Sequence, residues 1–259
     1  MPGSPITLFT DQNFTGNGDA AGLFDQVVRV QLSGPPLREK LRLFNCSPYK
    51  QTLFLDTDTY LLADVSELFD LLDHFDLAAT HDRAYQDWFP AEANVPRSFR
   101  ELNTGVLVYR KSAQTGRFLE DCLVWYDRLA PLPGPRFRGE MSDQPAFRAA
   151  VFHGALRVAA LTVEHNCRFP YFGHASGDIK LLHGREFLSE FCERELEKAG
   201  AALNAATTPR VFVAGDVWRL ARSDSPFSRR YVPRLTGRLF GSNLFSVIKK
   251  TRRYFRKGR

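Results

Sequence analysis

One short segment constrains the fold more than any other, because the apolar run Leu53-Phe54-Leu55 passes directly into Asp56-Thr57-Asp58. Three consecutive apolar residues without alternation are typical of a strand that is covered on both faces, as in the centre of an α/β sheet. Two carboxylates then follow the carboxyl end of that strand, where open α/β sheets bind ligands. The segment therefore predicts an α/β protein with a site beside Asp56 and Asp58.

Short β-branched and aromatic runs alternate with stretches of helical periodicity along much of the chain. This alternation predicts βα units and a mainly parallel central sheet. We expect strands at residues 5–9, 26–30, 52–55, 77–79, 105–109 and 179–182, and helices at 37–44, 65–72, 117–129, 142–151 and 186–198. Ser142 is expected to cap the helix at 142–151.

Composition excludes several classes of protein. The chain has 259 residues, 44% of them hydrophobic, which is enough to bury a large core and excludes disorder as the dominant state. Its four cysteines are scattered without a C-x-x-C pair, so neither a disulfide framework nor a zinc-cysteine cluster is expected. No apolar run reaches the roughly 18 residues of a membrane span, and the first residues lack the blocks of a signal peptide. The sequence therefore predicts a cytoplasmic protein.

The net charge of +6 hides an asymmetry along the chain. Residues Arg219 to Arg259 hold 13 basic residues and one acid, which leaves 22 basic and 28 acidic side chains in residues 1–218. A helix is expected at 244–255, with an apolar face opposed to lysines and arginines. We expect this tail to contact an anionic membrane surface on the cytoplasmic side, and do not expect a nucleic-acid partner. A solvated or disordered tail is the alternative.

The two aspartates suggest phosphate chemistry. Asp56 and Asp58 offer oxygen ligands to a hard divalent cation, which can in turn neutralise a diphosphate. That chemistry suits either nucleotide-sugar transfer or the hydrolysis of a phosphate ester. An Asp-Thr-Asp that only stabilises a turn is the structural alternative. The surroundings of the motif decide between these interpretations.

Those surroundings carry a resemblance to a known family. Residues 54–69 resemble the D-x-D segment of GT-A glycosyltransferases of the glycogenin and bacterial galactosyltransferase kind. Three further blocks follow in that family's order, Leu-Asn-Thr-Gly-Val-Leu-Val at 102–108, Ser-Asp-Gln-Pro-Ala-Phe at 142–147 and Ile-Lys-Leu-Leu-His-Gly at 179–184. The resemblance implies a GT-A-like catalytic domain at 1–200, with 201–259 as a basic, partly helical C-terminal extension.

The resemblance implies roles for ten residues. Asp56, Asp58 and His183 would hold a manganese ion (Mn²⁺) or Mg²⁺ that bridges the donor diphosphate and stabilises the leaving nucleotide. For His183, the alternative is a hydrogen-bonded histidine at a strand end. Lys40 stands where the family places a cation near the donor phosphates. Its alternative is a solvated helix lysine, and Arg38 or Arg42 on the same predicted helix could serve instead.

The other implied residues would contact the donor sugar. Asn103, Thr104 and Gly105 match an Asn-x-Gly-Val signature in which the amide faces the sugar and the glycine permits close approach of the backbone. Asp143 and Gln144 match the acidic-Gln pair that lines the reacting face, and are the expected catalytic residues. An ordinary turn at Asn-Thr-Gly and an acid favoured by a helix dipole are the alternatives.

Two further features are less specific. Asp82 falls where related enzymes place an acid that contacts the sugar. Aromatic faces stack on sugar rings, so an acceptor platform could use Trp88, Phe89, Phe169, Pro170, Tyr171 and Phe172, although aromatic residues also simply fill cores.

The resemblance implies transfer of a hexose, with retention, from a nucleoside diphosphate sugar such as a UDP-sugar to a glycan, lipid or protein acceptor. The chain departs from the family at two places. Residues 5–11 resemble the second strand of such folds, so the first βα unit, which holds the nucleobase in that family, is expected to be missing. Its loss would expose unpaired sheet edges. Gly184-Arg185-Glu186 replaces a Gly-x-x-Lys-Pro-Trp block, and Arg185 could substitute for its lysine.

Two other functions fit parts of the sequence. Residues 53–59 also fit a haloacid-dehalogenase phosphatase, with Asp56 as nucleophile, Asp58 as acid and Asp216 as a late metal-binding acid. That interpretation leaves the Asn-Thr-Gly and Asp-Gln blocks unexplained. A non-catalytic module that binds a membrane or nucleic acid through its basic tail is the second alternative.

Overall fold

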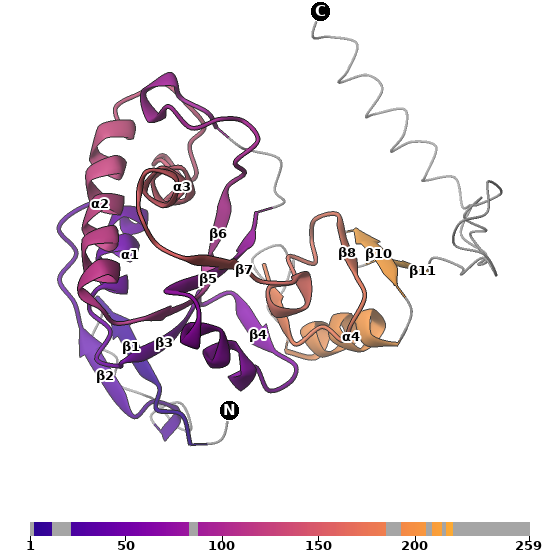
Figure 1. The fold of residues 1–259 in the computed structure, drawn as a ribbon. Coiled ribbons are helices and arrows are strands. Elements are labelled where there is room, and N and C mark those ends of the chain that lie inside the picture. Colours follow the sequence, from indigo (N-terminus) through magenta and orange to yellow (C-terminus); the bar gives the residue numbers. More distant parts are fainter. Residues whose placement is uncertain are drawn as a thin grey trace, which may run out of the picture.

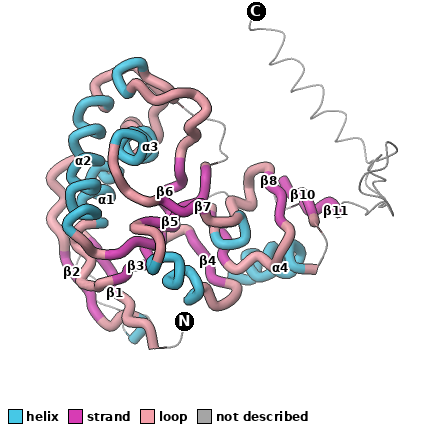
Figure 2. Tube along the Cα trace, viewed as in Figure 1, coloured by secondary structure: helices cyan, strands magenta, loops and turns pink. Residues whose placement is uncertain are grey.

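The computed structural model describes residues 3–11, 22–82, 88–184, 193–205, 209–213 and 216–219 (Figures 1 and 2). The strands are β1 (Thr7–Thr10), β2 (Gln26–Arg29), β3 (Gln51–Leu55), β4 (Thr59–Leu61), β5 (Leu77–His81), β6 (Leu102–Arg110), β7 (Val158–Ala160), β8 (Gly173–Ala175), β9 (Leu181–His183), β10 (Arg210–Val213) and β11 (Asp216–Arg219). The α-helices are α1 (Pro36–Phe44), α2 (Ala113–Leu129), α3 (Gln144–His153) and α4 (Glu193–Asn204), and 3₁₀ helices lie at η2 (Ser66–Asp73), η3 (Ala91–Ala93) and η4 (Val163–His165).

A four-stranded sheet with the order β3-β6-β5-β7 forms the centre of the molecule. Strand β6 pairs antiparallel with β3, with Leu55 opposite Val106, and antiparallel with β5, with Leu77 opposite Tyr109. Strand β7 pairs parallel with β5. Strands β3, β5 and β7 therefore share one direction, and β6 runs between two of them in the other.

The expectation of a mainly parallel sheet is thus corrected to a mixed sheet, because two of these three pairings are antiparallel. The apolar runs of β3 and β6 are the reason that the sequence misleads. A strand that is buried on both faces has the same composition whichever way it runs, so its direction is not encoded in its pattern.

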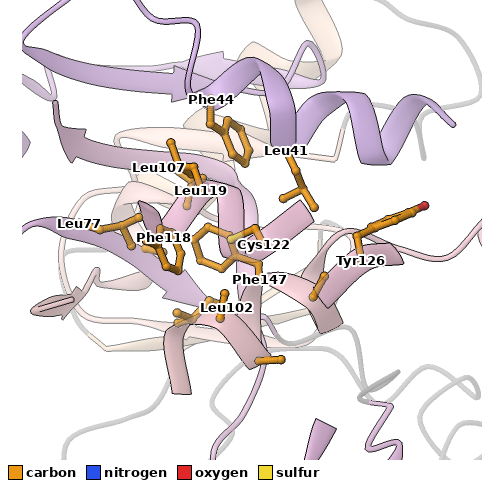
Figure 3. Close-up of a cluster of buried hydrophobic side chains, with 14 of the residues drawn as sticks. Leu41, Phe44, Leu77, Leu102, Leu107, Phe118, Leu119, Cys122, Tyr126 and Phe147 are labelled. Atoms are coloured by element: carbon orange, nitrogen blue, oxygen red, sulfur yellow. The ribbon is translucent and has the colours of Figure 1, made fainter. Parts of the chain in front are cut away.

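Both faces of the sheet are covered, as the unbroken apolar run of β3 predicts. Phe54 packs with α1, α2 and α3 in a cluster that includes Leu107 and Phe147, several of whose members are labelled in Figure 3. Leu53 and Leu55 point to the other face, into a second cluster with η2. Helices on one face and a 3₁₀ helix on the other hold the carboxyl end of β3 in place.

The first two strands form a sheet of their own. Strand β1 pairs parallel with β2, with Leu8 opposite Val27, and the described residues place this pair in a different sheet from β3. Residues of both β1 and β3 line one cleft.

A smaller group of elements lies beside the central sheet (Figure 1). Strand β10 pairs antiparallel with β8 and with β11. Phe212 of β10 and Leu203 of α4 are buried in one cluster with Cys167 and Ile179. Residues on both sides of position 200 thus share a core. The boundary expected at residue 200, between a catalytic domain and a C-terminal extension, stays a prediction. Within the described ranges, no helix combines the length and the apolar character that spanning a bilayer requires.

The local predictions are confirmed to different degrees. The helices expected at 37–44, 117–129 and 142–151 correspond to α1, α2 and α3. The helix expected at 65–72 is the 3₁₀ helix η2. Residue Asp143, not Ser142, is the N-cap of α3. The first part of the helix expected at 186–198, through residue 192, and all of the helix expected at 244–255 lie outside the described residues.

The buried carboxylate of Asp76 gives a test of stability. It accepts hydrogen bonds from the backbone N–H, Nε and Nη2 of Arg157 at 3.0, 3.2 and 3.1 Å, and Nε of Arg110 lies 3.3 Å away. The hydrogen bonds from Arg157, together with the nearby positive charges, hold the pKa of Asp76 below its ordinary value. At pH 7 we expect Asp76→Asn to lower the free energy of unfolding by about 1–3 kcal/mol.

The effect of Asp76→Asn should depend on pH. Because the folded-state pKa is depressed, the stabilisation is complete above the ordinary aspartate pKa of about 4 and is lost as the pH falls through the folded-state pKa. Urea unfolding gives the measurement, at pH 7 and at a series of values below pH 4. The difference in free energy of unfolding between wild type and Asp76→Asn should narrow as the pH falls. The exposed Asp73 supplies the control, Asp73→Asn. A difference that is constant with pH would contradict this account.

Candidate functional site

The ends of three strands meet at one edge of the central sheet. Asp56 follows β3, and its backbone N–H donates to the carbonyl of Gly105 at 2.8 Å. Asp82 follows β5, and its N–H donates to the carbonyl of Glu101, just before β6, at 2.8 Å. Because β6 runs antiparallel to its neighbours, its first residues, including Asn103, lie beside the last residues of β3 and β5.

His183 reaches the aspartates through a pairing that the sequence does not predict. Strand β4 begins just after Asp58 and pairs antiparallel with β9, so that Thr59 lies opposite His183. Gly184 adopts φ 107°, a left-handed conformation that favours glycine, and its N–H donates to the carbonyl of Asp58 at 3.0 Å. The backbone thus joins the two segments on both sides of His183.

Asp56, Asp58 and His183 form the cluster that the resemblance implies. One ligand atom from each residue lies within 4.8 Å of the other two, and Nε2 of His183 is 3.2 Å from Oδ1 of Asp58. Two carboxylate oxygens and one imidazole nitrogen are a donor set that accepts Mn²⁺. The cluster is therefore suited to a divalent cation, whose identity the geometry does not specify.

The glycine at position 105 makes room for this cluster. A Cβ atom there would lie 2.2 Å from Cε1 of His183 and 2.8 Å from Oδ2 of Asp56. No side chain larger than hydrogen fits between β6 and the two ligands without moving them. The sequence predicts close approach at Gly105, and the structure shows that the approaching groups are Asp56 and His183.

Lys40 is the cation of α1 that faces the acids. Its Nζ lies 2.8 Å from Oδ2 of Asp56 and 3.3 Å from Oδ2 of Asp143. Arg38 instead pairs with Asp127 at 2.7 Å, and Arg42 bonds Glu39 within the helix. Of the three candidates, Lys40 is therefore placed to meet a bound anion.

The charges around Lys40 keep it positive. Burial alone would lower the pKa of Lys40, but the charges of Asp143 and Asp56 hold it above its ordinary value. Burial would likewise raise the pKa of Asp58, but the neighbouring His183 and the charge of Arg168 hold it below its ordinary value.

The implied sugar-contacting residues form one hydrogen-bonded network. Oγ1 of Thr104 donates to Oδ2 of Asp143 at 2.6 Å, so the side chain of Asp143 faces the site although its backbone caps α3. Gln144 accepts from Nδ2 of Asn103 at 3.0 Å and donates to Oδ2 of Asp82 at 2.9 Å. All ten implied residues are thus brought together, while the role of each stays a prediction.

Three further residues of this region are not indicated by any pattern in the sequence. Glu101 is buried beside Gln144 and pairs with Arg148 at 3.3 Å. Arg168 stacks on Tyr171 with its Nη1 3.8 Å from Oδ1 of Asp82. Asn166 is 1% exposed and bonds both His183 and Asn103. None of the three stands in a motif, so no pattern in the sequence identifies them.

A cleft of about 1440 Å³ opens over the network and has room for a ligand larger than the ion. It is lined by all ten implied residues and also by Trp88 and Tyr171. Of the other aromatic candidates, Phe169 is buried in a core cluster and Phe89 packs against the guanidinium of Arg148. Only part of the proposed aromatic platform therefore faces the cleft. Arg185 and residues 220–259 lie outside the described part of the chain.

Comparisons with known proteins add a weak structural similarity to the geometry of the site. No family model and no curated protein matches the chain. Among solved structures it is similar to the apo structure of the WbbM bifunctional glycosyltransferase, with a TM-score of 0.39 and 18% sequence identity. The match covers 57% of this chain and 29% of that one, so the chain spans less than a third of that protein's length. A similarity at this level does not establish a shared function.

Proposed function

We propose that the protein is a divalent-metal-dependent glycosyltransferase that takes a hexose from a nucleoside diphosphate sugar. The observation that carries the proposal is the Asp56–Asp58–His183 cluster, with Lys40 at its edge, inside a cleft large enough for a nucleotide sugar. The four sequence blocks that resemble GT-A glycosyltransferases, two of which contain these three residues, support the same conclusion. A site that only binds a metal ion has no need of the hydrogen-bonded amides of Asn103 and Gln144 beside it, whereas a site that also binds a sugar does.

The residues of such a site would have different roles. When bound, the cation would supply positive charge against the diphosphate of the leaving nucleotide. Lys40 would add a second positive charge on the side of Asp143, since it lies between the cluster and that acid. Asn103 and Gln144 would orient the sugar through their amides, because their mutual hydrogen bond leaves further donor and acceptor positions for hydroxyls.

Several finer points remain proposals from the sequence. We propose a UDP-sugar as donor, Mn²⁺ or Mg²⁺ as cation, and retention of configuration. The acceptor would be a glycan, a lipid or a protein. Cytoplasmic location is likewise a proposal. So is contact of the tail at Arg219 to Arg259 with an anionic membrane, which rests on the basic charge of the tail and on the amphipathic helix expected there.

Calorimetric titration of UDP into the full chain tests the proposal directly. We expect binding at least about 10-fold tighter with Mn²⁺ than with a chelator, since a difference of about 1.4 kcal/mol suffices for that ratio. A coupled assay should then show Mn²⁺-dependent release of UDP from a UDP-hexose. UDP affinity that is indifferent to Mn²⁺, together with release of phosphate from p-nitrophenyl phosphate, would favour the phosphatase alternative instead.

A further inference from the structure

Asn166 occupies a position between the metal-binding cluster and the amide network. It follows η4 and is 1% exposed. Its Nδ2 donates to Oδ1 of Asn103 at 2.9 Å, and its Oδ1 lies 2.9 Å from Nδ1 of His183. One buried side chain thus contacts both groups.

The orientation of the Asn166 amide follows from its neighbours. Nδ2 of Asn103 donates to Gln144, and Oδ1 of Asn103 accepts from the N–H of Gly105 at 3.1 Å. The atom of Asn166 that faces this oxygen must be its nitrogen, so its oxygen faces His183. That oxygen only accepts, so Nδ1 of His183 carries the proton and Nε2 is turned toward Asp58.

We propose that Asn166 is a positioning residue that aims Nε2 of His183 at the cation site and couples this site to the sugar-facing amide of Asn103. The proposal rests on the metal-dependent function proposed above. A histidine ligand commonly donates its other ring N–H to an oxygen that sets its orientation, and loss of that partner lowers metal affinity by about 10–100-fold.

The backbone around Asn166 is held independently of its side chain. The N–H of Cys167 donates to the carbonyl of Leu181 at 2.9 Å, and the N–H of His183 donates to the carbonyl of Cys167 at 2.9 Å. These bonds remain when the amide is removed. A change at Asn166 therefore acts on the orientation of the His183 ring rather than on the path of β9.

Two substitutions separate the two contacts. Asn166→Ala removes both, so we expect Mn²⁺ affinity to fall by about 10–100-fold. Asn166→Asp keeps an oxygen acceptor for His183, so Mn²⁺ affinity should equal or exceed that of wild type. The same carboxylate has no donor for Oδ1 of Asn103, so affinity for UDP-glucose should fall at least about 10-fold, the loss of one buried hydrogen bond.

The experiment combines Mn²⁺ titration with pulsed electron paramagnetic resonance of the bound ion, which detects a coordinated imidazole nitrogen without any turnover. Wild type and Asn166→Asp should show the nitrogen coupling, and His183→Ala should lack it. In Asn166→Ala the coupling should be weakened or lost. Circular dichroism melts show whether each variant is folded.

A double variant distinguishes positioning from general damage. Once His183 is alanine, Asn166 has no ring to orient, so Asn166→Ala with His183→Ala should bind Mn²⁺ no more weakly than His183→Ala alone. Wild-type affinity and coupling in Asn166→Ala would overturn the inference, as would equal losses in the Ala and Asp variants. A wild type without nitrogen coupling would contradict the cation site itself, and so the proposed function as well.

Discussion

Substitution of Asp58 by asparagine is expected to abolish divalent-metal binding and metal-dependent turnover of a nucleotide sugar. Asparagine keeps the size of the side chain but not the negative charge, and Asp58 is one of only two carboxylates in the cluster with His183. Removal of a residue that hydrogen-bonds a metal ligand lowers metal affinity or activity by about 10–100-fold. Loss of the charge of a ligand itself should therefore lower metal affinity by at least about 100-fold. Mn²⁺ calorimetry and a UDP-release assay give the two readouts.

The fold should tolerate this change. Loss of the Asp58 charge removes its favourable interaction with His183, but the side chain is 19% exposed, which limits that loss, and repulsion between Asp56 and Asp58 is relieved at the same time. We therefore expect a melting temperature close to that of wild type. The control is Asp70→Asn, because Asp70 is an exposed aspartate of η2 outside the cleft. If Asp58→Asn retained wild-type Mn²⁺ affinity, the cluster would not be the cation site.

The second large effect is expected at Gly105. In Gly105→Ala the new Cβ would lie 2.2 Å from Cε1 and 2.8 Å from Nε2 of His183, and 2.8 Å from Oδ2 of Asp56. One methyl group would displace two of the three ligands at once. Overpacking of a buried site costs about 1–3 kcal/mol in stability, and we expect metal affinity to fall by at least about 100-fold, since both ligands move.

The chain offers a matched control for this substitution. Gly116 lies within α2, where an added Cβ would meet only Oδ1 of Asn45 at 3.9 Å, an ordinary contact. Alanine in a helix interior is favoured over glycine by about 0.5–1 kcal/mol. Gly116→Ala should therefore raise the free energy of unfolding by that amount in urea titrations, with unchanged Mn²⁺ affinity.

Comparison of the two glycine variants makes the test specific. Both changes add one methyl group, and they should alter stability in opposite directions. A Gly105→Ala protein that binds Mn²⁺ as wild type does would show that β6 does not hold the ligands as closely as the distances indicate. The close approach would then have no functional consequence.

Much of the candidate site could be predicted from local patterns. The run at 53–55 predicts a strand covered on both faces, which the packing of Phe54 and Leu55 on opposite faces confirms. Asp56 directly follows β3, Asn103 lies in β6 and Asp143 caps α3, so a short stretch of consecutive residues places each of them. The ten implied residues then line a single cleft.

Other features required the tertiary structure because no local pattern encodes them. Strands β4 and β9 have three residues each, too few to show an alternation, yet their pairing brings His183 to Asp58. Lys40, Arg38 and Arg42 lie on one helix and have similar chemistry, and only the packing of α1 shows which of them faces the acids.

The sequence by itself determined the α/β class, the strand that presents the aspartates and the residue types of the site, because periodicity and short motifs are local properties of a chain. The tertiary structure decided the antiparallel course of β6, the pairing that delivers His183 and the place of Asn166 between two groups. These depend on contacts between residues far apart in the chain, whose free energy is set by packing and by satisfied buried hydrogen bonds.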